Sequence, residues 1–409
     1  MNPTDTAPLP TAFKRLGWSN LSAQFSEQIA LAAAPLAAVL LLSAGPAETG
    51  WLQTAQTLPF LLLSIPAGLM VDRASRRRLM VGTEVLRALS LFAIPLLLVV
   101  GGLNLTWLGV LGALGAIGTV CYSVAAPAFV PSVVPRAQLA GANRWLELAR
   151  SAAYAGGPAL GGALVGWIGV STAYGLAAGL SVLAALLLAG LPKDDAPSGP
   201  RRALLHDLKE GARFVAGHDL LRPILVTAVF FNISWFVLQA IYVAYAVQNL
   251  GLTATEVGVT LGIYGAGMIV GAALAPQIAR RVSFGTLILL GPFAGFCAAA
   301  VMLATLWMPS VQLVGVSFFL FGVGPIIWTI STMTLRQAVT PNAMLGRVSA
   351  LIMTATFGAR PVGAAIGAAV AAHLGIAACL ALATAGFLVQ LLVIGFSQVP
   401  RLRDLSELA

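Results

Sequence analysis

One polar stretch between two apolar runs decides how this chain folds: Gly68-Leu69-Met70-Val71-Asp72-Arg73-Ala74-Ser75-Arg76-Arg77-Arg78-Leu79-Met80. The runs on either side, residues 51–71 and 80–101, are each long enough to cross the hydrocarbon core of a membrane as a helix. Arginine and lysine collect in the cytoplasmic loops of membrane proteins. The stretch therefore predicts two membrane helices joined by a short cytoplasmic link.

The composition indicates that the rest of the chain is also embedded in a membrane. Of its 409 residues, 59% are hydrophobic and only 9% are charged, whereas soluble domains are about a quarter charged. A water-soluble enzyme or nucleic-acid binder is therefore not expected. Twelve runs have the length of a membrane helix, so we predict an all-α integral membrane protein with twelve transmembrane helices at residues 18–43, 51–71, 80–101, 105–130, 147–168, 172–191, 220–248, 255–278, 284–307, 310–336, 344–373 and 376–397.

The basic residues predict the orientation of these helices. Of the 23 lysines and arginines, 21 lie in or next to the links on one side, and only Arg87 and Arg360 lie deeper within spans. We therefore expect both termini in the cytoplasm and a multi-pass protein of the bacterial inner (plasma) membrane. The first run begins with polar residues, which indicates a retained helix and not a signal sequence. The net charge of +9 reflects this topology and does not indicate a nucleic-acid partner.

A long link divides the twelve spans into two sets of six. The predicted parts are an N-terminal six-helix bundle, 1–191, a cytoplasmic linker, 192–218, and a C-terminal six-helix bundle, 219–409. The linker starts with residues that break helices. Apolar residues then recur at helical spacing among charged ones, which predicts an amphipathic helix at the membrane surface.

The two halves contain similar sequence elements at equivalent positions. Residues 135–139 precede the fifth span and residues 341–347 precede the eleventh, and both segments begin with proline. Within those spans, residues 157–162 and 360–363 again share proline and glycine. Equivalent elements at equivalent positions indicate a parallel internal repeat, which in transporters places the substrate between the halves and lets one half rock against the other.

These motifs resemble those of a known superfamily. Residues 68–80 are similar to the signature of the major facilitator superfamily, with Ser75 in place of its second glycine. Residues 157–162 resemble the core of its antiporter signature, although Ala153 stands where the full pattern has a glycine. Together with residues 341–348 and 360–363, they most resemble the proton-driven exporter branch that includes macrolide efflux proteins and the enterobactin exporter. The resemblance implies the major facilitator fold and an efflux function.

The two motifs also predict a conformational gate. A glycine lets a neighbouring helix approach closely, and a carboxylate at the cytoplasmic face can pair with an arginine or cap a helix. The alternative for the Asp-Arg pair is a solvated turn that only anchors the topology. The predicted gate residues are Gly68, Asp72, Arg73, Arg76, Arg77, Gly157, Pro158, Gly161 and Gly162.

Charged side chains inside the spans are the candidates for proton coupling, because charge inside a membrane is unfavourable and marks function. Glu27 shares a helix face with Gln24 and Gln28, and a partly desolvated carboxyl can exchange protons near neutral pH. We therefore predict Glu27 as the proton site, with a purely structural carboxylate as the alternative. The i, i+3 spacing of Glu84 and Arg87 favours an ion pair within one helix, with structure as its first role and coupling as its second.

Arg360 has no acidic neighbour in its own span, so it must face a partner, a cavity or an anionic ligand, and one hypothesis pairs it with Glu27. The fourth span lacks the arginine that drug exporters with the best-known proton relay carry there. Its four glycines, Gly109, Gly112, Gly115 and Gly118, instead predict close helix packing.

Polar and aromatic residues at helical spacing predict a cavity for an amphipathic organic molecule. Aromatic walls supply apolar contact, and a few amide groups supply orientation. Ordinary helix packing is the alternative for each residue taken singly. The candidates are Gln24, Gln28, Asn232, Trp235, Gln239, Tyr242 and Trp328.

No motif for catalysis, phosphate binding or metal ligation occurs in the sequence, so we expect neither an enzyme nor a cofactor or metal. The predicted function is secondary active transport: a monomer that exports a hydrophobic or amphipathic, drug-like small molecule in exchange for protons. One alternative is a dedicated exporter of a single metabolite such as a siderophore. Another is a non-transporting membrane sensor or assembly partner with the same fold.

Overall fold

The computed structural model describes residues 10–63, 66–135, 138–194 and 204–404. These residues are almost entirely helical. The helices are α1 (Thr11–Leu42), α2 (Pro46–Leu63), α3 (Pro66–Arg73), α4 (Arg76–Val99), α5 (Leu105–Val133), α6 (Leu139–Trp167), α7 (Val170–Ala189), α8 (Leu204–Ala216), α9 (Leu221–Gln248), α10 (Ala254–Ala279), α11 (Phe284–Ala304), α12 (Val311–Val339) and α13 (Asn342–Gly395), followed by a 3₁₀ turn (Val399–Arg401).

Every predicted span contains helix. Within the described ranges, nine helices are long and apolar enough to cross a membrane, and α13 is a single one of these although it covers two predicted spans. The second predicted span corresponds to α2 and α3, which lie on either side of residues 64–65, outside the described part. The prediction of an all-helical membrane protein is therefore confirmed.

Two predicted helix starts were wrong. Helix α1 begins at Thr11 and not at residue 18, and α6 begins at Leu139 and not at residue 147. In the first turns of α6, Asn143, Arg144 and Glu147 are exposed. The helix thus extends beyond its apolar part, where a search for apolar runs cannot find it.

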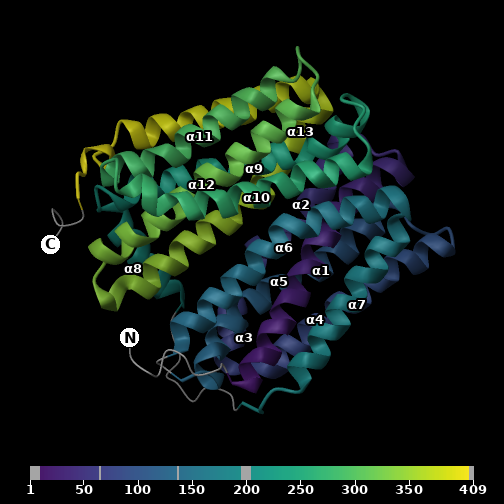
Figure 1. Cartoon of the computed structure of the whole chain (residues 1–409), viewed down its shortest axis with the longest axis horizontal. Helices are drawn as coiled ribbons and strands as arrows, with labels where there is room; N and C mark the ends of the chain where they lie inside the picture. The colour runs from purple at the N-terminus through teal and green to yellow at the C-terminus, as the bar shows by residue number, and fades with distance from the viewer. Residues whose placement is uncertain (1–9, 64–65, 136–137, 195–203, 405–409) are drawn as a thin grey trace. The chain divides into compact units, whose positions relative to one another are not determined.

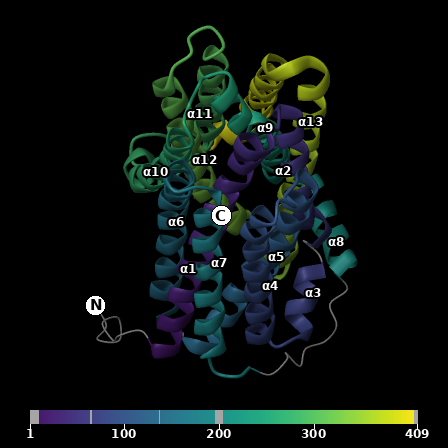
Figure 2. The ribbon, with the colours of Figure 1, turned by 90° about the vertical axis from the view of Figure 1, so that its right-hand side faces the viewer.

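The last long helix reverses direction at a glycine. Gly375 has φ 81°, a left-handed conformation that glycine adopts without steric cost, and it interrupts the helical geometry of α13. The thiol of Cys379 lies 3.4 Å from the carbonyl oxygen of Gly367, twelve residues earlier, which a straight helix would place about 18 Å away. Figure 2 shows the yellow ribbon of α13 turning back on itself. The predicted break between residues 373 and 376 is therefore confirmed.

The helices form two compact units. Unit 1 comprises residues 1–43, 55–200 and 253–262, and unit 2 comprises residues 44–54, 201–252 and 263–409. The first turns of α2 therefore belong to unit 2, and the first turns of α10 belong to unit 1. The division of the chain at residues 191 and 219 stays a prediction.

In unit 1, α1 packs against α6 and α7, and α4 packs against α5 and α7 (Figure 1). Two of the glycines in α5 face α2 and α4. A methyl group placed on Gly118 would lie 2.9 Å from the backbone oxygen of Thr83, and one on Gly112 would meet the side chain of Gln56. The predicted close packing of this glycine-rich helix is confirmed at these two positions.

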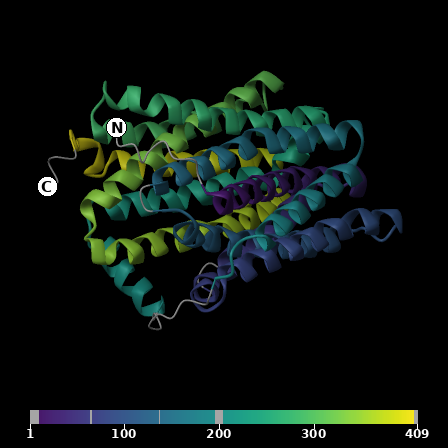
Figure 3. The same ribbon diagram turned by 60° about the horizontal axis from the view of Figure 1, so that its bottom comes forward.

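In unit 2, α9 packs against α13, and α11 packs against α12 and α13. Helix α8 is the amphipathic helix that the linker sequence predicts. Its Val215 packs with Leu221 and Val348, and Arg347 at the start of α13 forms ion pairs of 2.9 Å with Asp207 and 2.8 Å with Glu210. In Figure 3 the teal α8 lies against the yellow-green start of α13. This helix is thus fixed to the bundle by apolar contacts and by charge.

A histidine stabilises the link between α8 and α9 by hydrogen bonds to its backbone. The Nδ1 atom of His218 accepts hydrogen bonds from the backbone nitrogens of Leu220 and Leu221, at 3.2 and 3.4 Å. Burial lowers the pKa of His218 from its usual value, and the neighbouring carboxylate of Asp219 opposes this shift. A neutral imidazole is the form that can accept these bonds.

Candidate functional site

The middle of α1 carries a run of polar side chains. Ser26 is fully buried, and its hydroxyl donates to the carbonyl oxygen of Ala177 at 2.7 Å and lies 2.9 Å from the hydroxyl of Ser181 in α7. Gln28 is also buried, and its Nε2 atom has no hydrogen-bond partner in the described part of the chain. Gln24 and Glu27 are half-buried. The predicted proton site therefore lies in a helix whose neighbouring residues are packed inside unit 1.

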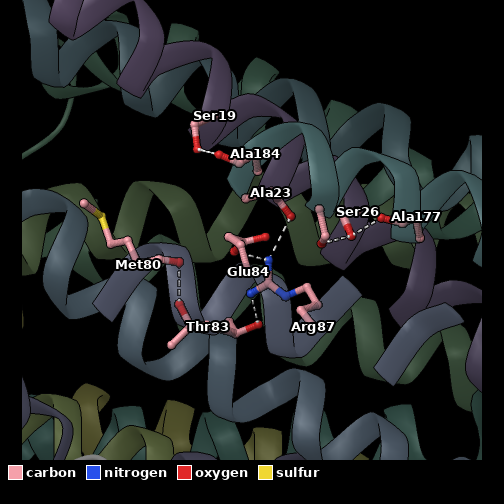
Figure 4. Close-up of polar contacts among 11 residues, drawn as sticks. Ser19, Ala23, Ser26, Met80, Thr83, Glu84, Arg87, Ala177 and Ala184 are labelled. Carbon is pink, nitrogen blue, oxygen red and sulfur yellow. Dashed lines mark hydrogen bonds and ion pairs between the residues drawn. The ribbon is translucent and has the colours of Figure 1, made fainter. Parts of the chain in front are cut away.

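Glu84 and Arg87 form the ion pair that their spacing predicts. Nη1 of Arg87 lies 2.8 Å from Oε1 of Glu84, and the two side chains are 4% and 0% exposed. Arg87 also donates to the carbonyl oxygen of Ala23 at 3.3 Å and to the hydroxyl of Thr119 at 2.7 Å. Figure 4 shows the guanidinium pointing from α4 toward α1. A single side chain thus connects α4 to α1 and α5.

More polar groups surround this pair than the sequence indicates. The Glu84 carboxyl interacts with the hydroxyl of Ser181 as well as with Arg87. The buried hydroxyl of Tyr122 interacts with Ser19 and with the charges of Glu84 and Arg87. Ser19 donates to the carbonyl oxygen of Ala184 at 3.0 Å (Figure 4). Serine and tyrosine also occur in apolar helices that only pack against one another. The sequence therefore gives no sign that these residues lie together.

The basic stretch that decides the fold is fixed by an aspartate from the linker. The carboxylate of Asp194 accepts hydrogen bonds from the hydroxyl of Ser75 at 2.6 Å and from the backbone nitrogens of Arg76 and Arg77 at 2.7 and 3.2 Å. These nitrogens form the first turn of α4, where a negative charge is stabilised. Ser75, the residue that departs from the superfamily pattern, caps the same helix by accepting from the backbone nitrogen of Arg78.

The rest of the predicted gate motif is only partly described. Arg76 donates to the carbonyl oxygen of Ala128, and Arg77 donates to those of Leu188 and Ala189. Two of the three predicted gate arginines therefore bind the backbone of neighbouring helices in unit 1. Gly68, Asp72 and Arg73 lie in α3, and their side chains are outside the described part of the structure. Their role in a gate stays a prediction.

Removing the Asp194 carboxylate is expected to loosen the start of α4. In Asp194→Ala, the three hydrogen bonds to Ser75, Arg76 and Arg77 are lost. Loss of a helix cap lowers the stability of a helix by about 1 kcal/mol. Hydrogen–deuterium exchange should show faster exchange of the amides of residues 76–80. Asp194→Asn, which keeps one oxygen acceptor, should give a smaller change. Exchange equal to that of the unaltered protein would show that this carboxylate does not hold the helix.

The glycine motif of α6 lies between two other helices of unit 1. A methyl group placed on Gly157 would meet Cβ of Gln28, and one on Gly161 would lie 3.0 Å from the backbone oxygen of Ile29, both in α1. On the other side, a methyl group on Gly162 would lie 2.5 Å from Cα of Gly258 in the first turns of α10. The glycines therefore permit contacts that no larger residue allows.

This contact between α6 and α10 continues along both helices. A methyl group on Gly258 would lie 2.7 Å from the backbone oxygen of Pro158, and one on Gly262 would lie 2.8 Å from that of Ala155. Pro158, another predicted gate residue, thus takes part through its carbonyl group. The pattern of small residues in α10, four positions apart, was not among the sequence predictions, although Gly258 and Gly262 show it directly.

Arg360 lies in α13 of unit 2, among aromatic rings. Its guanidinium carbon is 4.4 Å from the ring centre of Phe357 and 5.7 Å from that of Phe236 in α9. Cations are attracted to the faces of such rings. Glu27 belongs to unit 1, so the hypothesis that joins it to Arg360 stays a prediction.

Two of the predicted cavity residues of unit 2 are part of an aromatic core. Trp235 is stacked on Tyr264 at 5.1 Å between ring centres and meets Phe321 edge-on at 4.8 Å. Tyr242 is fully buried, with its ring 4.6 Å from that of Phe318. These three contacts are of the kind that ordinary helix packing gives.

The remaining candidates of unit 2 lie at partly buried positions. Asn232 donates to the carbonyl oxygen of Ala228 within its own helix at 2.9 Å. Gln239 is half-buried. Trp328 packs against an apolar cluster that includes Ile288 and Leu335. Their contact with a substrate stays a prediction.

Long apolar helices around buried polar side chains define a multi-pass membrane protein. Residues 4–408 match the family described as transmembrane secretion effector, a family of major facilitator type. The chain therefore belongs to this family, and the resemblance to the superfamily is confirmed.

Two curated relatives are named as exporters. The enterobactin exporter EntS of Citrobacter koseri is 31% identical over 210 residues, which cover 51% of this chain and 49% of that protein. The enterobactin exporter EntS of Shigella boydii serotype 18 is 29% identical over 240 residues, or 58% of this chain and 56% of that protein. The chain thus spans about half the length of the curated relatives that it matches.

Solved structures share the fold at low sequence identity. A bacterial homologue of the iron transporter ferroportin in an inward-facing state is 17% identical, with a TM-score of 0.71 over 94% of this chain and 97% of the other. A POT family transporter in complex with 5-aminolevulinic acid is 12% identical, with a TM-score of 0.75 over 95% and 96%. The chain thus belongs to a family of major facilitator type and shares the fold of these transporters.

Proposed function

We propose that this chain exports a hydrophobic or amphipathic small molecule out of the bacterial cell by alternating access, in exchange for protons. The observation that carries the proposal is Glu27, a half-buried carboxyl in the middle of α1 and between buried Ser26 and Gln28. A carboxyl in a membrane helix is unfavourable and marks a functional site, and proton relays are among the functions that such carboxyls serve. In this proposal Glu27 binds the proton, Arg360 and the Glu84–Arg87 pair assist the coupling, and the chain acts as a monomer in the inner membrane.

Equivalent helix contacts support two six-helix repeats. Gly157 and Gly161 of α6 approach Gln28 and Ile29 of α1 in unit 1. In unit 2, Gly363 and Gly367 of α13 approach Ile233 and Val237 of α9 in the same way. The fifth helix of each proposed repeat thus packs against the first through glycines. In the proposal, both termini lie in the cytoplasm and the two repeats rock against each other.

A dedicated exporter of one metabolite is the second candidate. It is favoured by the relatives named enterobactin exporters, although the similarity covers only about half of each protein. A dedicated exporter would transport a single compound and depend on polar contacts with it. A multispecific exporter would accept several unrelated amphipathic compounds that compete with one another.

Transport into inside-out vesicles tests the main proposal. Vesicles that contain the protein should accumulate a lipophilic cationic dye when a proton gradient is imposed, and a protonophore should abolish this uptake. Glu27→Gln should remove gradient-driven uptake, because the amide cannot exchange a proton. Glu147→Gln, which changes an exposed carboxyl of α6, is the matched control and should transport normally.

Two results would count against the proposal. Uptake by Glu27→Gln equal to that of the unaltered protein would remove Glu27 from the coupling. No uptake by correctly inserted, unaltered protein would exclude broad export of cationic compounds. The second result leads to a comparison of compounds secreted by cells with and without this protein, which tests the dedicated exporter.

A further inference from the structure

A cavity lies between two segments of unit 2, the α8–α9 link (residues 217–220) and the segment around the 3₁₀ turn (residues 398–403). Its volume is about 550 Å³, within the range of sites for small molecules. Its lining side chains are those of His218, Asp219, Leu220, Gln398, Arg401 and Leu402. None of the residues predicted for proton coupling, gating or substrate binding is among them. The cavity is therefore a separate candidate site.

Both walls of this cavity are held in place by the fold. In the link, Nδ1 of His218 accepts two backbone hydrogen bonds. In the 3₁₀ segment, the carbonyl oxygens of Leu402 and Arg403 accept from backbone nitrogens at the start of α11, at 2.9 and 3.2 Å. Leu220 and Val399 belong to one buried apolar cluster, which joins the two walls. The cavity is thus formed before any ligand binds.

The lining carries two opposite charges that do not meet. Asp219 comes from the link and Arg401 from the 3₁₀ segment, and both are exposed. Among the described residues, no ion pair joins them to each other or to a third side chain. The charge of Asp219 does act on the imidazole of His218. This neutral imidazole uses Nδ1 as an acceptor, so it carries its hydrogen at Nε2 and adds an N–H donor.

We propose that this cavity binds a small zwitterion, an α-amino acid with an apolar side chain. Arg401 and the Nε2 hydrogen of His218 bind its carboxylate, as cationic and N–H donors do. Asp219 binds its ammonium group. Leu220 and Leu402 supply the apolar part of the lining, against which the side chain of the ligand packs.

A zwitterion matches this lining better than a ligand of one charge. An anion would approach the carboxylate of Asp219, and a cation would approach the guanidinium of Arg401, and contact between like charges is unfavourable. A ligand with both charges pairs with each side chain and joins the link to the 3₁₀ segment. In the proposed topology the linker lies in the cytoplasm, so the ligand is an amino acid of the cytoplasm.

Binding of L-leucine to the full chain in lipid nanodiscs tests the inference. Equilibrium dialysis with the radiolabelled amino acid should show saturable binding. Isocaproate is leucine without the ammonium group, and isoamylamine is leucine without the carboxylate. Each should bind at least about tenfold more weakly, because each leaves one charge of the cavity without its partner. If either analogue binds as tightly as leucine, the site recognises a single charge and the inference is overturned.

Variants of the two charged side chains locate the binding site. Arg401→Gln and Asp219→Asn should each weaken leucine binding by at least about tenfold, since each removes one charged contact. Both side chains are exposed, so the variants should fold normally. Arg150→Gln and Glu147→Gln remove the same charges from α6 in unit 1 and should bind leucine as the unaltered protein does.

Two further measurements make the result unambiguous. Gln398→Trp keeps both charges but fills the cavity, so it should also abolish binding. Leucine should slow hydrogen–deuterium exchange of the amides in residues 217–220 and 398–402. The inference is overturned if leucine shows no saturable binding, or if binding is unchanged in Arg401→Gln and Asp219→Asn. No proton gradient is used, so the outcome is independent of the proposed export.

Discussion

Arg87→Met is expected to lower the free energy of unfolding by about 3–5 kcal/mol, the typical effect of breaking a buried ion pair by removing one partner. The Glu84 carboxyl is 0% exposed, so the substitution leaves it buried without its cation. It also removes the hydrogen bonds to Ala23 and Thr119, which connect α4 to α1 and α5. The effect can be measured by denaturation in mixed micelles, followed by tryptophan fluorescence.

The exposed pair in α6 provides the matched control. Glu147 and Arg150 have the same i, i+3 spacing and a contact of 2.5 Å, but their side chains are 56% and 42% exposed. Arg150→Met should therefore change stability by less than about 1 kcal/mol. The effect of Arg87→Met should also shrink at low pH, because an unpaired buried carboxyl binds a proton. Equal effects at the two sites would show that burial of the first pair has no energetic consequence.

Gly162→Ala is expected to destabilise the protein by about 1–3 kcal/mol, as overpacking does, and to reduce transport. The added methyl group would lie 2.5 Å from Cα of Gly258 and 2.6 Å from the backbone oxygen of Ala254. Both are backbone atoms, which cannot rotate away as a side chain can. The contact between α6 and α10 would therefore have to widen.

A glycine in the neighbouring helix serves as the control for Gly162→Ala. A methyl group on Gly179 of α7 meets nothing within 4 Å. Gly179→Ala should be neutral or stabilising by about 0.5–1 kcal/mol, since alanine favours a helix more than glycine does. The two substitutions are chemically identical and should have opposite signs. Unfolding midpoints and dye uptake of the two variants check this, and equal midpoints would refute the steric argument.

The sequence predicts the helices well because their signal is local. Length and apolar character identify the spans, and Gly375 marks the break between the last two. The spacing of Glu84 and Arg87 predicts their contact for the same reason, since both lie in one helix. The starts of α1 and α6 were missed because these helices continue past their apolar parts.

The partners that complete the site could not be predicted, because they come from distant parts of the chain. Thr119 and Ser181 meet the Glu84–Arg87 pair only after α4, α5 and α7 have packed. Asp194 stands in a stretch of linker that the sequence identifies only by its helix-breaking residues, yet it caps α4 more than a hundred positions earlier. Side-chain spacing indicates contacts within a helix and carries no information about its neighbours.

The contact between α6 and α10 has a further consequence under the proposed alternating access. Around its three glycines it consists of the Cα atoms of Gly162 and Gly258 and of backbone carbonyl groups, which are already hydrogen-bonded within their own helices. These carbonyl groups belong to Ala155, Pro158 and Ala254. Separating such surfaces in lipid leaves no polar group unsatisfied, so the free-energy difference between joined and parted helices is only that of dispersion contacts. Under the proposed alternating access, such a contact can therefore open without breaking a hydrogen bond or an ion pair. It can then form again in the same register.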